Sequence, residues 1–117
     1  MLLAYADAVT LKEVLSSKLH RYTPHTVTKP RLVEVELGRV RDQGWASTTE
    51  ELEIGLNGVA APIHDATGRV IAAVGASGPS YRLDVDSFPA VAAQLLAGAT
   101  AIGARLGYFE QALPELP

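Results

Sequence analysis

The chain has 117 residues, of which 48% are hydrophobic and 20% charged, a composition typical of a single globular domain with a hydrophobic core. Its formal net charge of −3 gives no basic surface for nucleic acid or for an anionic membrane, so direct DNA binding by this chain is not expected. Cysteine is absent, which excludes disulfides and thiolate metal sites and fits a reducing compartment.

The N-terminus does not have the pattern of a targeting signal. MLLAYADAV lacks a basic region and reaches Asp7 too early for a secretory signal. The apolar stretch near the C-terminus is interrupted by Gln94, Gly98 and Arg105, so no membrane-spanning helix and no membrane partner are expected. These features favour a cytoplasmic protein.

Two helices are expected in the first 20 residues. The first runs from Leu2 to Ala8 and begins without a capping residue. Thr10 and Glu13 form a capping box for the second, because each side chain can accept a bond from a free backbone amide. Apolar residues then recur at helical spacing, at Leu11, Val14, Leu15 and Leu19.

A third helix and a short strand follow a polar loop at residues 20–28. Pro30 suits a first helical turn, where the N–H that proline lacks would be unbonded, and Gly44 provides a C-terminal stop. Residues 45–49 are β-prone, and the acidic run at 50–53 is interpreted as a solvated loop rather than an acid site. The apolar stripe of this helix consists of Val33, Leu37 and Val40.

The clearest structural signal is a β-hairpin. Two apolar runs, 59–63 and 70–76, flank Asp65-Ala66-Thr67-Gly68, in which Asp starts a type I turn and Gly takes the left-handed position. A four-residue loop places position 64 opposite 69, whereas a three-residue loop with a bulge would slip the register by one residue. In the first case, one face carries Gly58, Ala60, Pro62, His64, Ile71, Ala73, Gly75 and Ser77 and is small enough to line a cavity. The core face then carries Val59, Ala61, Ile63, Val70, Ala72, Val74 and Ala76.

A long C-terminal helix is expected after a cap at Asp84 or Ser87, and it ends at Gly107. Gly98 and Gly103 weaken it, which indicates that they permit close packing. The tail from Tyr108 onwards is expected to be loosely ordered. The apolar stripe of this helix consists of Phe88, Val91, Ala92, Leu95, Ala99, Ile102 and Leu106.

No catalytic or metal site is expected. Ser77, His64 and Asp65 have the residue types of a nucleophile, a base and an orienting acid, but the hairpin places Ser77 and His64 at opposite ends of the paired strands. His64 is therefore interpreted as solvated. His20 and His25 lack the spacing of a zinc motif.

Three further side chains leave two interpretations open. Arg82 suits an anionic ligand or a structural salt bridge to a nearby acid. Trp45 and Tyr81 suit a pocket lining, although large aromatics at strand ends are more often part of the core.

A series of short motifs along the chain resembles the effector-binding domain of IclR-type bacterial transcriptional regulators. The match runs in the right order over nearly the whole chain, although each motif is weak alone. The motifs are Leu2-Leu3-Ala4, Thr26-Val27-Thr28, Gly44-Trp45-Ala46, Glu50-Glu51, Gly55, Ala60-Ala61-Pro62-Ile63, Asp65, Gly68 and Ser77-Gly78-Pro79 through Arg82.

The resemblance implies a GAF/profilin-like α+β domain, in which an antiparallel sheet packed with helices holds a small organic acid or aromatic metabolite. About three strands of that sheet are expected here. Residues 1–117 then form a partial effector-binding domain without the winged helix-turn-helix that binds DNA in this family. A sheet lacking some strands has an unpaired edge, which favours a homodimer.

Four ligand-binding positions follow from the resemblance: Thr48, Gly58, Gly75 and Ser77. The family often has an acid at the position of Thr48, a small polar or thiol residue at that of Gly58, and hydroxyls at those of Gly75 and Ser77. Only Ser77 keeps a hydroxyl of that set, so this pocket favours a larger or more apolar ligand.

The sequence therefore predicts a non-enzymatic, ligand-sensing regulatory domain without a cofactor. The alternative is an oligomerisation or interaction module with a vestigial pocket.

Overall fold

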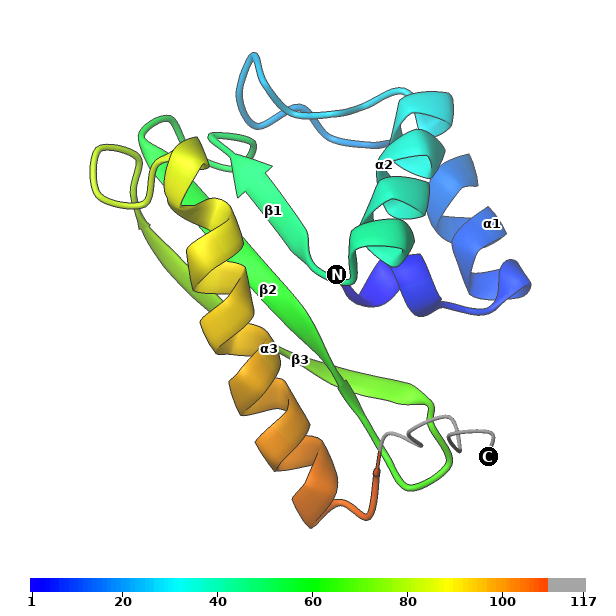
Figure 1. Cartoon of the computed structure of the whole chain (residues 1–117). Coiled ribbons are helices and arrows are strands. Elements are labelled where there is room, and N and C mark those ends of the chain that lie inside the picture. Colours follow the sequence, from blue (N-terminus) through cyan, green and yellow to red (C-terminus); the bar gives the residue numbers. More distant parts are fainter. Residues whose placement is uncertain (110–117) are drawn as a thin grey trace.

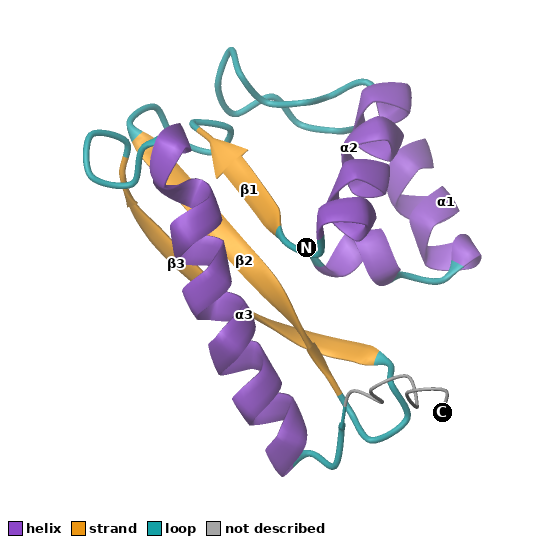
Figure 2. Ribbon diagram, in the orientation of Figure 1, coloured by secondary structure: helices purple, strands orange, loops and turns teal. Residues whose placement is uncertain are grey.

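The computed structural model describes residues 1–109, which form an α+β domain around a three-stranded antiparallel sheet of order β1-β2-β3. One long helix, α3, lies along one face of the sheet. The N-terminal helices lie next to β1, away from α3 (Figures 1 and 2). In chain order the elements are η1 (Leu2–Tyr5), α1 (Ala8–Ser16), α2 (Pro30–Gln43), β1 (Ala46–Thr49), β2 (Leu56–His64), β3 (Val70–Pro79), η2 (Val85–Ser87) and α3 (Phe88–Arg105). The α+β class and the three strands are confirmed.

The first two helices differ from the prediction. Residues 2–5 form only a 3₁₀ turn, and Asp7 rather than Thr10 caps α1, because its carboxylate accepts from the Thr10 amide at 2.7 Å. This earlier cap replaces the predicted capping box and starts the helix at Ala8. The helix ends at Ser16, before Leu19.

The α2 helix follows the prediction at both ends. Pro30 is its first residue, and Gly44 closes it in the left-handed conformation with φ 87°. Leu37 and Val40 of α2 pack with Ala4 and Ala46, so the N-terminal segment is attached to the sheet through the first residue of β1. Arg41 strengthens this attachment by donating to the carbonyl of Ala4 at 3.0 Å.

The hairpin turn is confirmed, but its predicted register is wrong. The Gly68 amide donates to the Asp65 carbonyl at 2.9 Å, with Gly68 left-handed at φ 82°. Arg69 belongs to the turn, since its carbonyl accepts from the Asp65 amide, and His64 therefore pairs with Val70. A second shift follows at once, and Ile63 pairs with Ala72. Two slips of one residue restore the predicted faces of the strands beyond this point.

The hydrophobic core lies between β2 and α3. Val59, Ala61 and Ile63 are buried as predicted, against helix residues that include Phe88 and Ala92. Gly103 permits close packing, since a Cβ there would lie 3.3 Å from the His64 carbonyl oxygen. Gly98 instead faces open space, so its predicted packing role is wrong.

One composition-based expectation also needs correction. The helical stretch Val85–Arg105 is long and apolar enough to cross a membrane by length and composition, despite Gln94 and Gly98. In the structure Phe88, Ala92, Ala99 and Gly103 of this stretch are buried, and Val59 and Ala61 of β2 belong to the same core clusters. One side of this stretch thus contributes core residues, although only 22% of its apolar window is buried.

Candidate ligand pocket

The four predicted ligand-binding residues line one depression on the face of the sheet opposite the core. Thr48, Gly58 and Ser77 are direct neighbours across the three strands, and Gly75 belongs to the adjacent row beside Ala60. The depression has a volume of about 230 Å³. Its lining consists of Met1, Ala46, Ser47, Thr48, Gly58, Val59, Ala60, Gly75, Ala76 and Ser77.

Two hydroxyl groups converge on Gly58 at the floor of the pocket. A Cβ at Gly58 would lie 3.2 Å from the Thr48 Oγ1 and 3.7 Å from the Ser77 Oγ, so both hydroxyls border the space that the missing side chain leaves. Among the hydrogen bonds of residues 1–109, neither hydroxyl has a partner. Both are therefore available to a ligand, whereas the remaining floor is small and apolar.

Small residues occupy the two neighbouring cross-strand rows that form the floor of the pocket. The neighbours Ala46, Ala60 and Gly75 form the second row. At Gly75 an added Cβ would lie 3.2 Å from the Val59 carbonyl oxygen, which belongs to the backbone and has little freedom to move. The two glycines therefore differ: Gly58 is next to a side chain that can rotate, and Gly75 is next to a fixed peptide group.

Buried and half-buried polar groups form hydrogen bonds at the end of the sheet next to Thr48, Gly58 and Ser77. The Asn57 side chain, 2% exposed, donates to the Leu83 carbonyl at 2.8 Å and accepts from the Glu50 amide at 3.1 Å. Thr23 donates from its hydroxyl to the Glu50 carbonyl at 2.6 Å, and Thr26 does the same to Glu51. These bonds connect the loop at 20–28 to the loop between β1 and β2.

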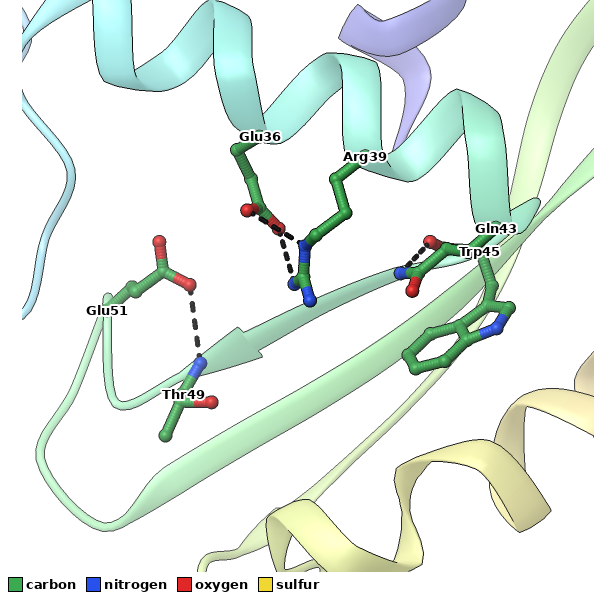
Figure 3. Close-up of polar contacts among 6 residues, drawn as sticks. All are labelled: Glu36, Arg39, Gln43, Trp45, Thr49 and Glu51. Carbon is green, nitrogen blue, oxygen red and sulfur yellow. Dashed lines mark hydrogen bonds and ion pairs between the residues drawn. The ribbon is translucent and has the colours of Figure 1, made fainter.

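Side chains also bond two backbone groups on the outer edge of β1, as Figure 3 shows. The Gln43 amide donates to the Trp45 carbonyl at 2.7 Å, and the Glu51 carboxylate accepts from the Thr49 amide at 3.3 Å. Arg39 and Glu36 form an ion pair with a 2.8 Å contact above the same strand. Burial raises the pKa of Glu51, and the Glu36 carboxylate adds to this, while the bond from the Thr49 amide opposes it.

Apart from Ser77, the candidate catalytic and metal-ligating residues do not line this pocket. Ser77 pairs with Gly58, six residues along β2 from His64, which corresponds to about 20 Å. His64 is not simply solvated, because it stacks on Tyr108 with ring centroids 4.6 Å apart. Among residues 1–109 no group of three metal-ligating side chains occurs.

The three residues with two open interpretations also have clear positions. Tyr81 is 84% exposed and lies neither in the core nor in the pocket, so both of its interpretations are wrong. Trp45 packs against the core cluster of Val59 and Phe88, as the core interpretation predicts. Arg82 is exposed, and the ion pair recorded within residues 1–109 is that of Arg39 and Glu36. The tail at 110–117 lies outside the described residues.

Sequence reasoning missed several residues of this site. Ser47 and Met1 line the pocket, and Asn57 fixes the loops beside it. Ser47 follows the buried Ala46 on a short strand that the sequence marks only weakly. Asn57 offers the better signal, because a polar residue in the period-two core pattern of a strand requires buried partners.

Comparisons with known proteins agree with this geometry. The family described as "Bacterial transcriptional regulator IclR C-terminal" matches residues 1–104. The transcriptional regulator KdgR of Dickeya chrysanthemi is 35% identical over 111 residues, which cover 94% of this chain and 36% of that protein. The crystal structure of the C-terminal domain of Escherichia coli KdgR is 34% identical with a TM-score of 0.82, covering 92% of this chain and 66% of that one.

A third similar structure is the inducer-binding domain of the PobR transcription factor from Acinetobacter, a double mutant in complex with 3-hydroxybenzoic acid. It is 27% identical with a TM-score of 0.76, and the match covers 92% of this chain and 60% of that one. These neighbours confirm the GAF/profilin-like α+β fold. The chain spans about a third of the length of the curated relatives it matches. It belongs to the family of IclR-type bacterial transcriptional regulators, within their C-terminal domain.

Proposed function

We propose that this chain is a non-catalytic, small-molecule-sensing regulatory domain whose ligand binds in the depression above Gly58. The observation that carries the proposal is the pair of unbonded hydroxyls, Thr48 and Ser77, on either side of a glycine in a hollow lined mainly by small residues. Such a site fixes the orientation of a ligand through a few polar groups and holds the rest of it by apolar contact.

The proposed ligand is a small organic acid or an aromatic metabolite. The cavity of about 230 Å³ is below the usual range for drug-sized molecules, roughly 300–1,000 Å³, and suits a compact ligand. This volume does not support the larger ligand that the loss of polar groups predicts from the sequence. The complex of the PobR domain with 3-hydroxybenzoic acid supports this class. No charged side chain lines the pocket within residues 1–109, so a carboxylate would be bound by hydroxyls and backbone amides.

The proposed mechanism is a shift between arrangements of associated chains. The pocket joins the sheet to the N-terminal segment, because Met1 and Ala46 line it and Ala46 packs against α2. A ligand that contacts both parts favours one of their relative positions and so biases an oligomer. In this proposal residues 1–117 act as part of an effector domain in the cytoplasm, and a winged helix of a full-length regulator binds the DNA.

The test is direct binding of 3-hydroxybenzoic acid, benzoic acid and pyruvic acid, followed by protein NMR shifts and native mass spectrometry. A specific ligand should shift the amides of Thr48, Gly58 and Ser77 together. Ser77→Leu fills the pocket and should weaken binding at least about tenfold, since one lost polar contact and a steric block each act on affinity. Ala73→Leu is the matched control, because Ala73 is exposed on the same strand and face but does not line the pocket.

Two results would overturn the proposal. One is the absence of binding by any of these acids and by a wider panel of organic and aromatic acids, with no ligand retained on purification. The other is binding that Ser77→Leu and Ala73→Leu weaken equally. Either would leave the alternative of an interaction module with a vestigial pocket, whose association the pocket variants do not change.

A further inference from the structure

Asn57 lies at the centre of the strand row next to the pocket. It pairs with Thr49 on β1 and with Gly78 on β3, and it directly precedes Gly58 of the pocket floor. Because successive residues of a strand point to opposite faces, its side chain lies on the core side, where it is 2% exposed. Packing alone would favour an apolar residue at such a position, since a buried amide is costly unless it is bonded. The amide of Asn57 therefore needs another explanation.

The side chain of Asn57 connects β2 to the segments that follow both neighbouring strands. Its Oδ1 accepts from the Glu50 amide at 3.1 Å, directly after β1, and its Nδ2 donates to the Leu83 carbonyl at 2.8 Å, in the segment after β3. Leu83 is bonded back to the end of β3, because its amide donates to the Pro79 carbonyl at 2.9 Å. One buried amide thus holds the ends of β1 and β3 beside β2.

The pocket hydroxyls of Thr48 and Ser77 lie one residue from the row of Asn57. The strand that carries Thr48 has only four residues, so few ladder bonds hold it to β2. On the pocket face, Gly58 offers no side chain against which the two hydroxyl residues could pack. The separation of the hydroxyls therefore depends on the bonds that Asn57 makes behind them.

Glu50 makes the end of β1 particularly dependent on hydrogen bonds. Its φ of 54° is the only positive value at a non-glycine residue within 1–109, and this conformation is unfavourable for a residue with a Cβ. The groups that bond to Glu50 are the Asn57 side chain, the Leu56 carbonyl, the Thr23 hydroxyl and the Gly55 amide. Loss of the Asn57 bond removes one of the contacts that offset the strain.

We propose that Asn57 is a positioning residue of the ligand site, which sets the separation of the Thr48 and Ser77 hydroxyls across Gly58. Its side chain lies on the opposite face of the sheet and does not line the pocket, so it acts through these two residues. This role rests on the proposed ligand site and deepens it. A ligand bound through two hydroxyls requires that they be held in place before it arrives, and a buried residue outside the pocket meets that requirement.

The first test needs no ligand. Three-bond NMR couplings to the methyl carbon of Thr48 report the rotamer of its side chain. They should indicate one rotamer in the unaltered chain and averaging over several in Asn57→Ala. Gln43→Ala is the matched control, because the Gln43 amide donates to the Trp45 carbonyl at 2.7 Å beside the opposite end of β1. Its loss should leave the Thr48 couplings unchanged.

The second test is a double-mutant cycle with 3-hydroxybenzoic acid as the ligand. Asn57→Ala should weaken binding by about tenfold, the effect of one lost hydrogen bond, and Gln43→Ala by less than about twofold. In a chain with Thr48→Val and Ser77→Ala, Asn57→Ala should have no further effect, because no hydroxyl remains to be positioned. A merely structural role would lower the affinity equally in both backgrounds.

A third measurement uses the unaltered chain and does not depend on the folding of a variant. Asn57 is the sole asparagine, so its side-chain amide signals are readily assigned. In native-state hydrogen exchange, this amide and the backbone amides of Glu50 and Gly58 should open together, with the same dependence on urea. The Asp65 amide, which donates to the Arg69 carbonyl beyond the other end of β2, should open separately.

The outcomes separate this inference from the proposed function. Unchanged Thr48 couplings in Asn57→Ala, additive losses in the cycle, or opening of the Asn57 side chain independently of Gly58 would each overturn the positioning role. Altered couplings in a chain that binds none of the tested acids would instead overturn the proposed function, while the control of the hydroxyls by Asn57 stands.

Discussion

The two faces of the hairpin differ in packing: one is buried in the core and the other lines the pocket. On the face that meets α3, Val59, Ala61 and Ile63 are at most 6% exposed and pack with Phe88 and Ala99. On the other face, Gly58, Ala60 and Gly75 leave a hollow. Since successive residues of a strand point to opposite faces, a single stretch of sequence can specify both a core and a cavity.

The surroundings of a residue, rather than its own size or hydrophobicity, distinguish the two faces. Ala60 and Ala61 are the same residue, yet Ala61 is fully buried and Ala60 lines the pocket. The role of each alanine is set by its neighbours across the strands. Changes of equal size on the two faces should therefore have unequal effects on stability.

The largest expected effect is on the core face. Phe88→Ala should lower the free energy of unfolding by about 3–5 kcal/mol, because it removes a large side chain that is 4% exposed. Urea unfolding followed by the fluorescence of Trp45, the sole tryptophan, measures this change. Tyr81→Ala is the control, since an 84% exposed ring should contribute within about 0.5 kcal/mol. Similar losses for both variants would mean that Phe88 does not anchor the core.

A smaller contrast is expected at the adjacent alanines. Ala61→Val overpacks a position with 0% exposure and should cost about 1–3 kcal/mol. Ala60→Val places the same two methyl groups in the pocket and should cost less than about 0.5 kcal/mol. Paired urea curves give the difference directly. If Ala60→Val proves the more costly change, the hollow above Ala60 is filled in solution.

The two pocket glycines sharpen the contrast within one face. Gly75→Ala brings a Cβ within 3.2 Å of the Val59 carbonyl oxygen, and we expect a loss of about 1 kcal/mol because the backbone must move. Gly58→Ala meets the Thr48 Oγ1 at the same 3.2 Å, but this side chain can rotate, and alanine lowers the entropy of the unfolded chain. Gly58→Ala should therefore be near neutral in stability. Thermal unfolding of both variants tests this order, which the reverse ranking would contradict.

The sequence predicted those parts of the fold that depend on local patterns. Period-two alternation identified the core face, and the residue types of Pro30, Gly44 and Gly68 marked the ends of α2 and the hairpin turn. The register at His64 depends instead on whether Arg69 joins the turn or the strand. The local residue types fit loops of more than one length, so they do not decide this. The predicted faces were correct only because a second slip followed the first.

The candidate site shows the same division. Thr48, Gly58, Gly75 and Ser77 were brought together by a resemblance and by strand geometry, and the structure places all four around one hollow. The contributions of Met1 and Ala46 depend on how the N-terminal segment packs over the sheet, which is a long-range contact without a local signal. That Thr48, Gly58, Gly75 and Ser77 bind a ligand stays a prediction.

The smallest expected effect concerns the outer edge of β1, where the Glu51 carboxylate accepts a hydrogen bond from the Thr49 amide. Burial raises the pKa of this carboxyl, so the folded state holds its proton more tightly than the unfolded state does. Its contribution is therefore fully present below the unfolded pKa of about 4.3 and is lost as the pH rises through the higher folded value. At pH 7 the ionised Glu51 is slightly destabilising.

Glu51→Gln should accordingly raise stability at pH 7 by a few tenths of a kcal/mol, a small gain because solvent screens a half-exposed group. The glutamine carbonyl can still accept a hydrogen bond from the Thr49 amide, so this bond at the outer edge of β1 is kept. The gain should disappear below about pH 4, where Glu51 is protonated in both states. Glu53→Gln, exposed in the same loop, removes an equal charge and is the control for net charge. A gain that is the same for both variants, or that persists at low pH, would show that net charge or another property of glutamine, rather than burial of Glu51, is responsible.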